Sequence, residues 1–191
     1  MKKLAVFASG TGTNVYNLLK HFELSSNCKI VLVLTNNPNS GALKHAESFK
    51  VSHVTLPNNS IENHDELIKV LKEFEIDGIV LAGFLRKIPN EIVALYEDLI
   101  VNIHPSLLPK YGGKGMFGIN VHNAVFSYKE KETGITIHKV NEVYDEGGII
   151  AQFFTSIEDC KTANQIQKKV QQLEKTYFPI VVEKYFSNKG N

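Results

Sequence analysis

The chain has 191 residues, enough for one sizeable hydrophobic core, and we expect a single domain. Its 21 lysines and arginines nearly balance 20 aspartates and glutamates, so no overall field would attract nucleic acid or a membrane surface. Cys28 and Cys160 form no CxxC pattern, which argues against a disulfide framework and a zinc site. No apolar stretch approaches the roughly 18 residues of a membrane span. We expect a cytoplasmic protein, monomeric or weakly homodimeric, with small-molecule substrates and without nucleic-acid or membrane partners.

The first half of the chain alternates short apolar runs with amphipathic segments. Such alternation, with nearly continuous apolar strands, is typical of a parallel sheet covered by helices on both faces. The expected strands are residues 3–8, 29–34, 52–56 and 78–82, the expected helices are 15–22, 41–50 and 65–74, and residues 57–63 are expected to form a polar loop.

A loop rich in glycine and threonine joins the first expected strand to the first helix. Its sequence, SGTGTN at residues 9–14, would present backbone N–H groups and a helix N-terminus to an anion such as a phosphate. It matches neither GxGxxG nor GxxxxGK[ST]. The second strand ends in Thr35 and Asn36, where a dinucleotide enzyme would carry an acidic residue, so a dehydrogenase is disfavoured. The loop alone leaves a phosphate site and a purely structural turn equally open.

The segment at residues 99–109, LIVNIHPSLLP, places polar groups at the end of a buried strand. Its apolar start predicts the strand, and Pro105 interrupts the pattern. Because side chains alternate along a strand, Asn102 and His104 share one face and Ile103 lies on the other. Ligands collect at the carboxyl edge of open α/β sheets, so this pair is a candidate site. From these residues alone, a histidine that only holds the following loop remains the alternative.

The pattern changes after residue 109. A Gly/Lys-rich loop at residues 110–115 is either a flexible connector or a lid over a site. Two expected strands, 133–140 and 148–154, are joined by a turn at 143–148, which predicts antiparallel or mixed pairing. The expected helices are 117–128 and 164–186, the second broken or bent near Pro179. The predicted fold is a single-domain, doubly wound α/β structure, with a mostly parallel sheet, helices on both faces and mixed pairing toward the C-terminus.

Five motifs, in this order and spacing, resemble those of the folate-dependent formyltransferases. They are SGTGTN, LAGFLR, VNIHPSLLPKY, the pair Thr136–His138 and the turn YDEGG, and the resemblance covers essentially the whole chain. It implies transfer of a formyl group from 10-formyltetrahydrofolate to the amine of glycinamide ribonucleotide, a step of purine biosynthesis. It also implies a phosphate-binding half, residues 1–100, and a catalytic and folate-binding half, residues 101–191, with no metal.

The resemblance further implies roles for individual residues, with Asn102, His104 and Asp145 as the catalytic group. Attack of an amine on a formyl carbon builds negative charge on oxygen and positive charge on nitrogen. Asn102 would donate to the oxyanion, and His104 would carry a proton while Asp145 orients its ring. The ribonucleotide is expected at Gly12, Thr13, Asn14, Gln171, Gln172, Leu173 and Glu174. The folate is expected at Leu85, Arg86, Lys87, Ile88, Asn102, Asn141, Glu142, Val143, Tyr144 and Asp145.

Other functions remain open from the sequence. A methionyl-tRNA formyltransferase would need a further C-terminal domain and a basic surface, and a formyltetrahydrofolate hydrolase would need a regulatory N-terminal domain; we expect this chain to have neither. A non-catalytic binding module for a phosphorylated ligand is a less favoured alternative, in which His104 would be structural. Turnover that depends on the second substrate would separate these functions.

Overall fold

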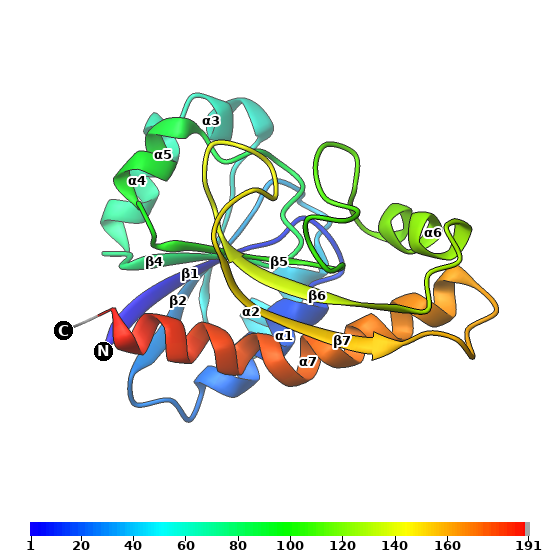
Figure 1. Ribbon diagram of the computed structural model, residues 1–191. Helices are drawn as coiled ribbons and strands as arrows, with labels where there is room; N and C mark the ends of the chain where they lie inside the picture. The colour runs from blue at the N-terminus through cyan, green and yellow to red at the C-terminus, as the bar shows by residue number, and fades with distance from the viewer. Residues whose placement is uncertain (190–191) are drawn as a thin grey trace.

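A seven-stranded β-sheet with the strand order β3-β2-β1-β4-β5-β6-β7 forms the centre of the computed structural model, which describes residues 1–189 (Figure 1). The strands are β1 (Lys2–Phe7), β2 (Cys28–Thr35), β3 (Ser52–Thr55), β4 (Gly78–Leu81), β5 (Ile100–His104), β6 (Glu132–Lys139) and β7 (Ile149–Ser156). The helices are α1 (Thr13–Phe22), α2 (Gly41–Ser48), α3 (Asn58–Glu62), α4 (Asp65–Glu73), α5 (Asn90–Leu95), α6 (Ile119–Ser127) and α7 (Ala163–Asn188).

The pairing confirms the predicted fold class. Strands β1 to β5 pair in parallel, whereas β6 pairs antiparallel with both β5 and β7. The chain runs outward from β1 to β2 and β3, and then returns to place β4 on the other side of β1. This reversal of strand order opens a crevice at the carboxyl ends of β1 and β4, which is where open α/β sheets bind ligands.

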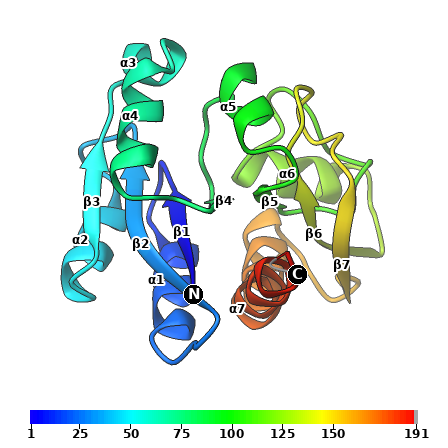
Figure 2. The same ribbon diagram turned by 90° about the vertical axis from the view of Figure 1, so that its left-hand side faces the viewer.

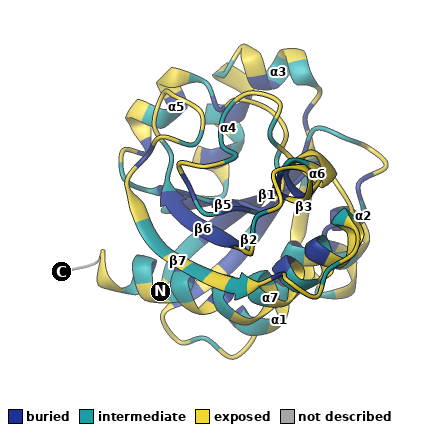
Figure 3. Ribbon diagram, turned by 45° about the vertical axis from the view of Figure 1, so that its right-hand side comes forward, coloured by how far each residue is buried: buried dark blue, intermediate teal, exposed yellow. Residues whose placement is uncertain are grey.

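Two hydrophobic clusters lie on the two faces of the sheet. In β1, Leu4 and Val6 pack toward α1 and α7, and Ala5 and Phe7 pack toward the α3–α5 side. Figure 2 shows α1, α2 and α7 on one side of the sheet and α3, α4 and α5 on the other. Burial is concentrated on the central strands, while β7 closes one edge with much of its surface exposed (Figure 3).

The structure differs from the sequence-based expectation at three places. Residues 57–63 are not a simple polar loop, because α3 begins after Pro57 and buries Ile61. The short helix α5, which follows Pro89, was not predicted. Helices α3 and α5 are both too short to show a helical repeat of apolar residues. The last helix was predicted to be broken or bent near Pro179. A break is wrong, since α7 runs through Pro179 as one element, and a bend there stays a prediction. A proline removes one backbone hydrogen bond, and the burial of Phe178 and Val182 beside it outweighs that loss.

None of the helices within residues 1–189 combines the length and the apolar character needed to cross a membrane.

Candidate active site

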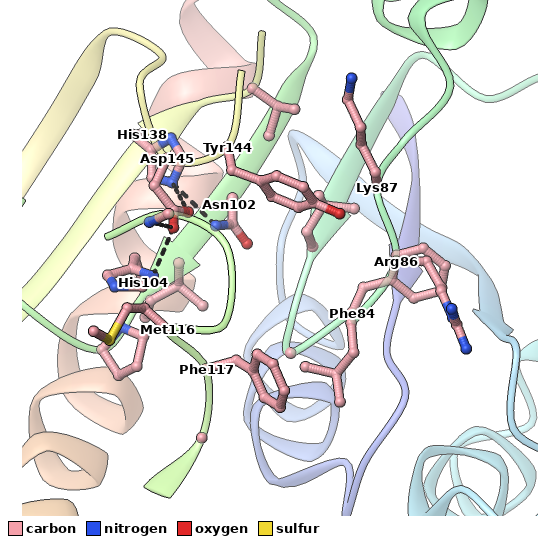
Figure 4. A pocket seen from close by; sticks show the side chains of 18 of the residues that line it. Phe84, Arg86, Lys87, Asn102, His104, Met116, Phe117, His138, Tyr144 and Asp145 are labelled. Atoms are coloured by element: carbon pink, nitrogen blue, oxygen red, sulfur yellow. Dashed lines mark hydrogen bonds and ion pairs between the residues drawn. The ribbon is translucent and has the colours of Figure 1, made fainter. Parts of the chain in front are cut away.

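A cavity of about 390 Å³ lies where the segments after β4, β5 and β6 meet helices α1, α6 and α7 (Figure 4). Its volume is within the usual range of small-molecule sites, roughly 300–1,000 Å³. It contains polar side chains from parts of the chain that are far apart in sequence. Those used below are Asn14, Asn102, His104, His138, Asp145 and Glu174.

Most of the predicted site residues line this cavity, and five do not. Those that do are Asn14, Leu85, Arg86, Lys87, Ile88, Asn102, His104, Asn141, Val143, Tyr144, Asp145, Gln171 and Glu174. Gly12 and Thr13 belong to the adjacent loop and first helical turn, and Glu142 is exposed. On α7, Gln171 and Glu174 are three residues apart and share one side of the helix. Gln172 and Leu173 therefore project elsewhere, and Leu173 packs against the core.

His104 is hydrogen-bonded through one ring nitrogen and faces a carboxylate with the other. Its side chain is on the same face of β5 as that of Asn102, opposite Val101 and Ile103, as predicted. Nε2 lies 2.7 Å from the carbonyl oxygen of Tyr111, and because a carbonyl only accepts, Nε2 carries a hydrogen. Nδ1 faces Oδ2 of Asp145 at 3.5 Å, which is longer than a direct hydrogen bond. Nδ1 is therefore the atom of this ring that remains for proton exchange.

His138, to which the sequence analysis gave no role, orients the amide of Asn102. The two residues are partners across β5 and β6, and Nδ2 of Asn102 lies 3.0 Å from Nε2 of His138. Nδ1 of His138 donates to the carbonyl of Lys139 at 2.8 Å, so in the neutral ring Nε2 accepts from Asn102. Burial lowers the pKa of His138 and favours this neutral form. The second hydrogen on Nδ2 of Asn102 remains available to a ligand.

Asp145 connects both histidines to the Gly-rich loop. Oδ2 accepts a hydrogen bond from the backbone N–H of Gly113 at 2.8 Å, and Oδ1 lies 3.7 Å from Nε2 of His138. Asp145 has a left-handed backbone with φ of 59°, which is uncommon for a residue other than glycine and often marks a functional site. The single carboxylate thus lies between the two rings (Figure 4).

Three buried histidines line the cavity, and they differ in which ring nitrogens are hydrogen-bonded. In His104, the nitrogen without a hydrogen bond faces a carboxylate. His104, His122 and His138 are all buried. Burial lowers the pKa of His122 to about 4, and the positive charge of His104 adds to that shift. Burial thus favours the neutral forms of His122 and His138. Of the two rings beside Asp145, His104 is the one whose nitrogen facing the carboxylate makes no hydrogen bond.

The α1–α7 side of the cavity contains a carboxyl group with a single side-chain partner. Nδ2 of Asn14 donates to Oε2 of Glu174 at 2.9 Å, while Oδ1 of Asn14 is buried without a hydrogen-bond partner in the described residues. Desolvation raises the pKa of Glu174 to about 7, and the hydrogen bond from Asn14 only partly offsets it. These groups can accept and donate hydrogen bonds that the protein itself does not provide.

The loop before α1 leaves the helix N-terminus free for an anion. Gly12, the N-cap residue just before α1, has φ of 79°, and no side chain among residues 1–189 caps the first turn. The first N–H groups of the helix therefore have no partner within it, as an anion site requires. A Cβ on Gly12 would lie 2.6 Å from the backbone nitrogen of Ala42, so α2 also restricts this position to glycine.

Exposed apolar side chains surround the mouth of the cavity. Leu85, Phe117, Val143 and Tyr144 retain between 45% and 52% of their surface although they line it. Large apolar groups that remain exposed at a cavity are typical of a site for a flat, partly apolar ligand.

Ser9 connects the loop before α1 to the wall at residues 83–88. Its hydroxyl donates to Oδ1 of Asn36 at 2.6 Å and accepts from the backbone N–H of Leu85 at 3.0 Å. Its backbone N–H donates to the carbonyl of Gly83 at 3.0 Å. The sequence analysis missed this role and the cavity position of His122, and no motif indicated either. His138 appeared in the sequence analysis only as part of the pair Thr136–His138, and the pairing of its strand with β5, which makes it the partner of Asn102, could not be read from that pair alone.

The fold and the cavity define a class of protein: an α/β protein with a histidine–carboxylate pair at a small-molecule site. The model of the formyl transferase family matches residues 2–182. Phosphoribosylglycinamide formyltransferase of Bacillus subtilis is 32% identical over 197 residues, covering 100% of this chain and 98% of that protein. The chloroplastic phosphoribosylglycinamide formyltransferase of Arabidopsis thaliana is 39% identical over 187 residues, covering 94% of this chain. This chain spans 64% of the length of that plant protein.

A solved structure shows the same fold. The crystal structure of phosphoribosylglycinamide formyltransferase from Bacillus halodurans matches with a TM-score of 0.89 and 32% identity, over 100% of this chain and 98% of the other. This chain belongs to the formyl transferase family. Within residues 1–189 no group of three histidine, cysteine, aspartate or glutamate side chains is arranged to hold a metal ion.

Proposed function

We propose that this protein transfers the formyl group of 10-formyltetrahydrofolate to the amine of glycinamide ribonucleotide. The observation that carries the proposal is the meeting of Asn102, His104 and Asp145 at one cavity, with Nδ1 of His104 facing the carboxylate at 3.5 Å. The names of its relatives support the same reaction. The reaction forms a C–N bond to the formyl carbon and breaks the bond from that carbon to the folate nitrogen.

Asn102 would stabilise the charge that develops on the formyl oxygen. One hydrogen of Nδ2 is held by His138, so the other has a defined direction before substrate arrives. Such a donor costs no reorganisation when the oxyanion forms, which is how preorganised donors accelerate acyl transfer. The donor also keeps its neutral charge, since an amide does not titrate.

His104 and Asp145 would move the one proton that the reaction transfers. The attacking amine loses a proton, and the folate nitrogen gains one as its bond to the formyl carbon breaks. Nδ1 of the protonated ring can give a proton to the leaving folate nitrogen. The adjacent carboxylate of Asp145 favours the second transfer, in which Nδ1 takes up a proton from the attacking nitrogen. The carbonyl of Tyr111 keeps the ring in place during both transfers.

The two substrates would occupy different sides of the cavity. The N-terminus of α1 suits the phosphate of the ribonucleotide, and Asn14, Gln171 and Glu174 suit its ribose and glycinamide groups. The apolar mouth near Leu85 and Tyr144 suits the folate ring. Both halves of the chain, 1–100 and 101–191, thus contribute to the reaction. The cytoplasmic location and the monomeric or weakly homodimeric state expected above are proposed with this function.

Loss of the formyl donor, measured with and without glycinamide ribonucleotide, tests the proposal. We expect consumption only when the ribonucleotide is present, with one formylated ribonucleotide detected by mass spectrometry for each tetrahydrofolate formed. Equal consumption without it would indicate a hydrolase, and consumption only with charged initiator tRNA would indicate a tRNA formyltransferase. Binding without consumption would indicate a non-catalytic module.

A further inference from the structure

Two buried side-chain atoms in residues 1–189 have no hydrogen-bond partner, and both belong to residues of the cavity. They are Oδ1 of Asn14 and Nδ1 of His122. Such an atom lowers stability unless something else completes its bonding, so each instance needs a reason. Asn14 has one in the proposed function, because a bound ribonucleotide would supply a donor. His122 has no part in the steps above.

His122 reaches the cavity from the helix that packs against α7. It is only 2% exposed, and its neighbour Val121 packs in the core. Helices α1 and α6 both contact α7, which brings Gln171 and Glu174 to the same cavity. His122 therefore belongs to the side of the cavity proposed above for the ribonucleotide. It is also close enough to His104 for the charge of that ring to disfavour its own.

The charge state of His122 limits what it can bind. With a pKa lowered to about 4 by burial, the ring is neutral near pH 7 and offers one N–H donor and one acceptor. A neutral ring suits an uncharged polar group better than a phosphate. In glycinamide ribonucleotide, the uncharged polar group next to the reacting amine is the amide of the glycinamide unit.

We propose that His122 is a substrate-contacting residue whose neutral imidazole forms a hydrogen bond with the glycinamide amide beside His104. The identity of the ligand rests on the proposed function. In the ligand-free protein the imidazole lowers stability, and in the complex its free nitrogen gains a partner. A histidine that served packing alone would have the opposite effect, since its removal would weaken the fold and leave binding unchanged.

Substitutions at this position separate the two roles. His122→Phe keeps a ring and removes both polar atoms, His122→Leu removes them in a smaller side chain, and His122→Gln keeps a donor and an acceptor. Val125→Ala, in the same helix and in the core, is the control for disturbed packing. The measurements are the thermal midpoint without ligand and the Kd values for glycinamide ribonucleotide and for tetrahydrofolate, by calorimetry without a formyl donor.

We expect His122→Phe to leave the thermal midpoint unchanged or higher and to weaken ribonucleotide binding about tenfold, as loss of one hydrogen bond commonly does. His122→Leu should weaken binding similarly, and His122→Gln should stay within about threefold of the wild type. Tetrahydrofolate binding should not change. Val125→Ala should lower the midpoint and leave both Kd values alone.

Wild-type ribonucleotide affinity in both His122→Phe and His122→Leu would overturn the inference, as would failure of both variants to fold. If the wild-type protein binds tetrahydrofolate but not glycinamide ribonucleotide, the proposed function fails and the assignment of His122 falls with it. If the wild type binds both and these variants still bind normally, the assignment of His122 alone is wrong.

Discussion

The two sides of the cavity differ in how their polar groups are satisfied. On the β5–β6 side, Asn102 and His104 each have a partner within the protein, at 3.0 Å and 2.7 Å. On the α1–α7 side, the amide oxygen of Asn14 has no hydrogen-bond partner within residues 1–189, and the carboxyl of Glu174 is poorly solvated. A network that is already satisfied is rigid and ready for the transition state. The unsatisfied side gains most when a ligand binds, so substitutions on the two sides should have separable effects.

The largest expected effect is that of His104→Ala on turnover. Removing the proposed proton carrier should lower kcat about 10²–10³-fold, within the range for loss of a positioned catalytic group. Affinity for the ribonucleotide should stay nearly unchanged, because its phosphate and ribose are proposed to bind elsewhere in the cavity. Steady-state kinetics and calorimetry check this, with the exposed His53→Ala as the control. An equal loss of affinity would remove the distinction between the two sides.

Asn14→Ala should show the converse pattern with a smaller effect. It removes the side chain that would receive the ribonucleotide and deprives Glu174 of its side-chain partner. We expect about tenfold weaker ribonucleotide binding and a nearly normal kcat at saturation. Asn17→Ala, in the same helix but outside the cavity, is the control. A large fall in kcat at saturating substrate would place Asn14 in the chemical step instead.

The stability of the ligand-free protein should depend on the ionisation of Glu174. The folded-state pKa of about 7 is raised from an ordinary value of 4.5, so ionisation opposes folding and stability is lost as pH rises from about 4.5 to 7. Glu174→Gln should therefore have a free energy of unfolding about 1–2 kcal/mol higher than that of the wild type at pH 8, a range that allows for the part of the side chain that faces the cavity. Near pH 4.5 the two proteins should have similar stability. Urea unfolding at both pH values measures this difference.

Glu183, on the same helix, is a control because its pKa is shifted in the opposite direction from that of Glu174. The hydroxyl of Ser25, together with His21, lowers the pKa of its carboxyl, so its ionised form stabilises the fold. Glu183→Gln should lose stability at pH 8 and lose less as pH falls below the ordinary carboxylate range. If both substitutions changed the free energy of unfolding in the same direction at pH 8, the two carboxyl groups would not differ as described.

The smallest expected effect concerns the wall formed by residues 83–88. Ser9→Ala removes the acceptor for the N–H of Leu85, which lines the mouth of the cavity. We expect a rise of a few-fold in the KM for the folate, faster hydrogen exchange at the Leu85 amide, and an unchanged KM for the ribonucleotide. Ser48→Ala, at an exposed serine in α2, is the control. Unchanged exchange at Leu85 would show that Ser9 does not hold this wall.

The sequence could predict the sheet and the catalytic strand because their signals are local. Apolar runs identified each of the strands to within a few residues, and alternation placed Asn102 and His104 on one face. Asp145 was assigned through resemblance alone, since no local pattern says that a turn after β6 folds back to β5. The roles of Tyr111 and Ser9 depend on backbone contacts between distant segments. Nothing in the periodicity of a sequence encodes such contacts.

The measurement that tests the central claim most directly is the rate of formyl transfer in the double variant Asn102→Ala, His104→Ala. The account has both residues act on one tetrahedral intermediate, one on its oxygen and the other on its leaving nitrogen. Residues that serve one transition state are strongly non-additive, so the double variant should be little slower than the poorer single variant. Losses that multiply in full would mean that the two residues act in separate steps, and would contradict the account.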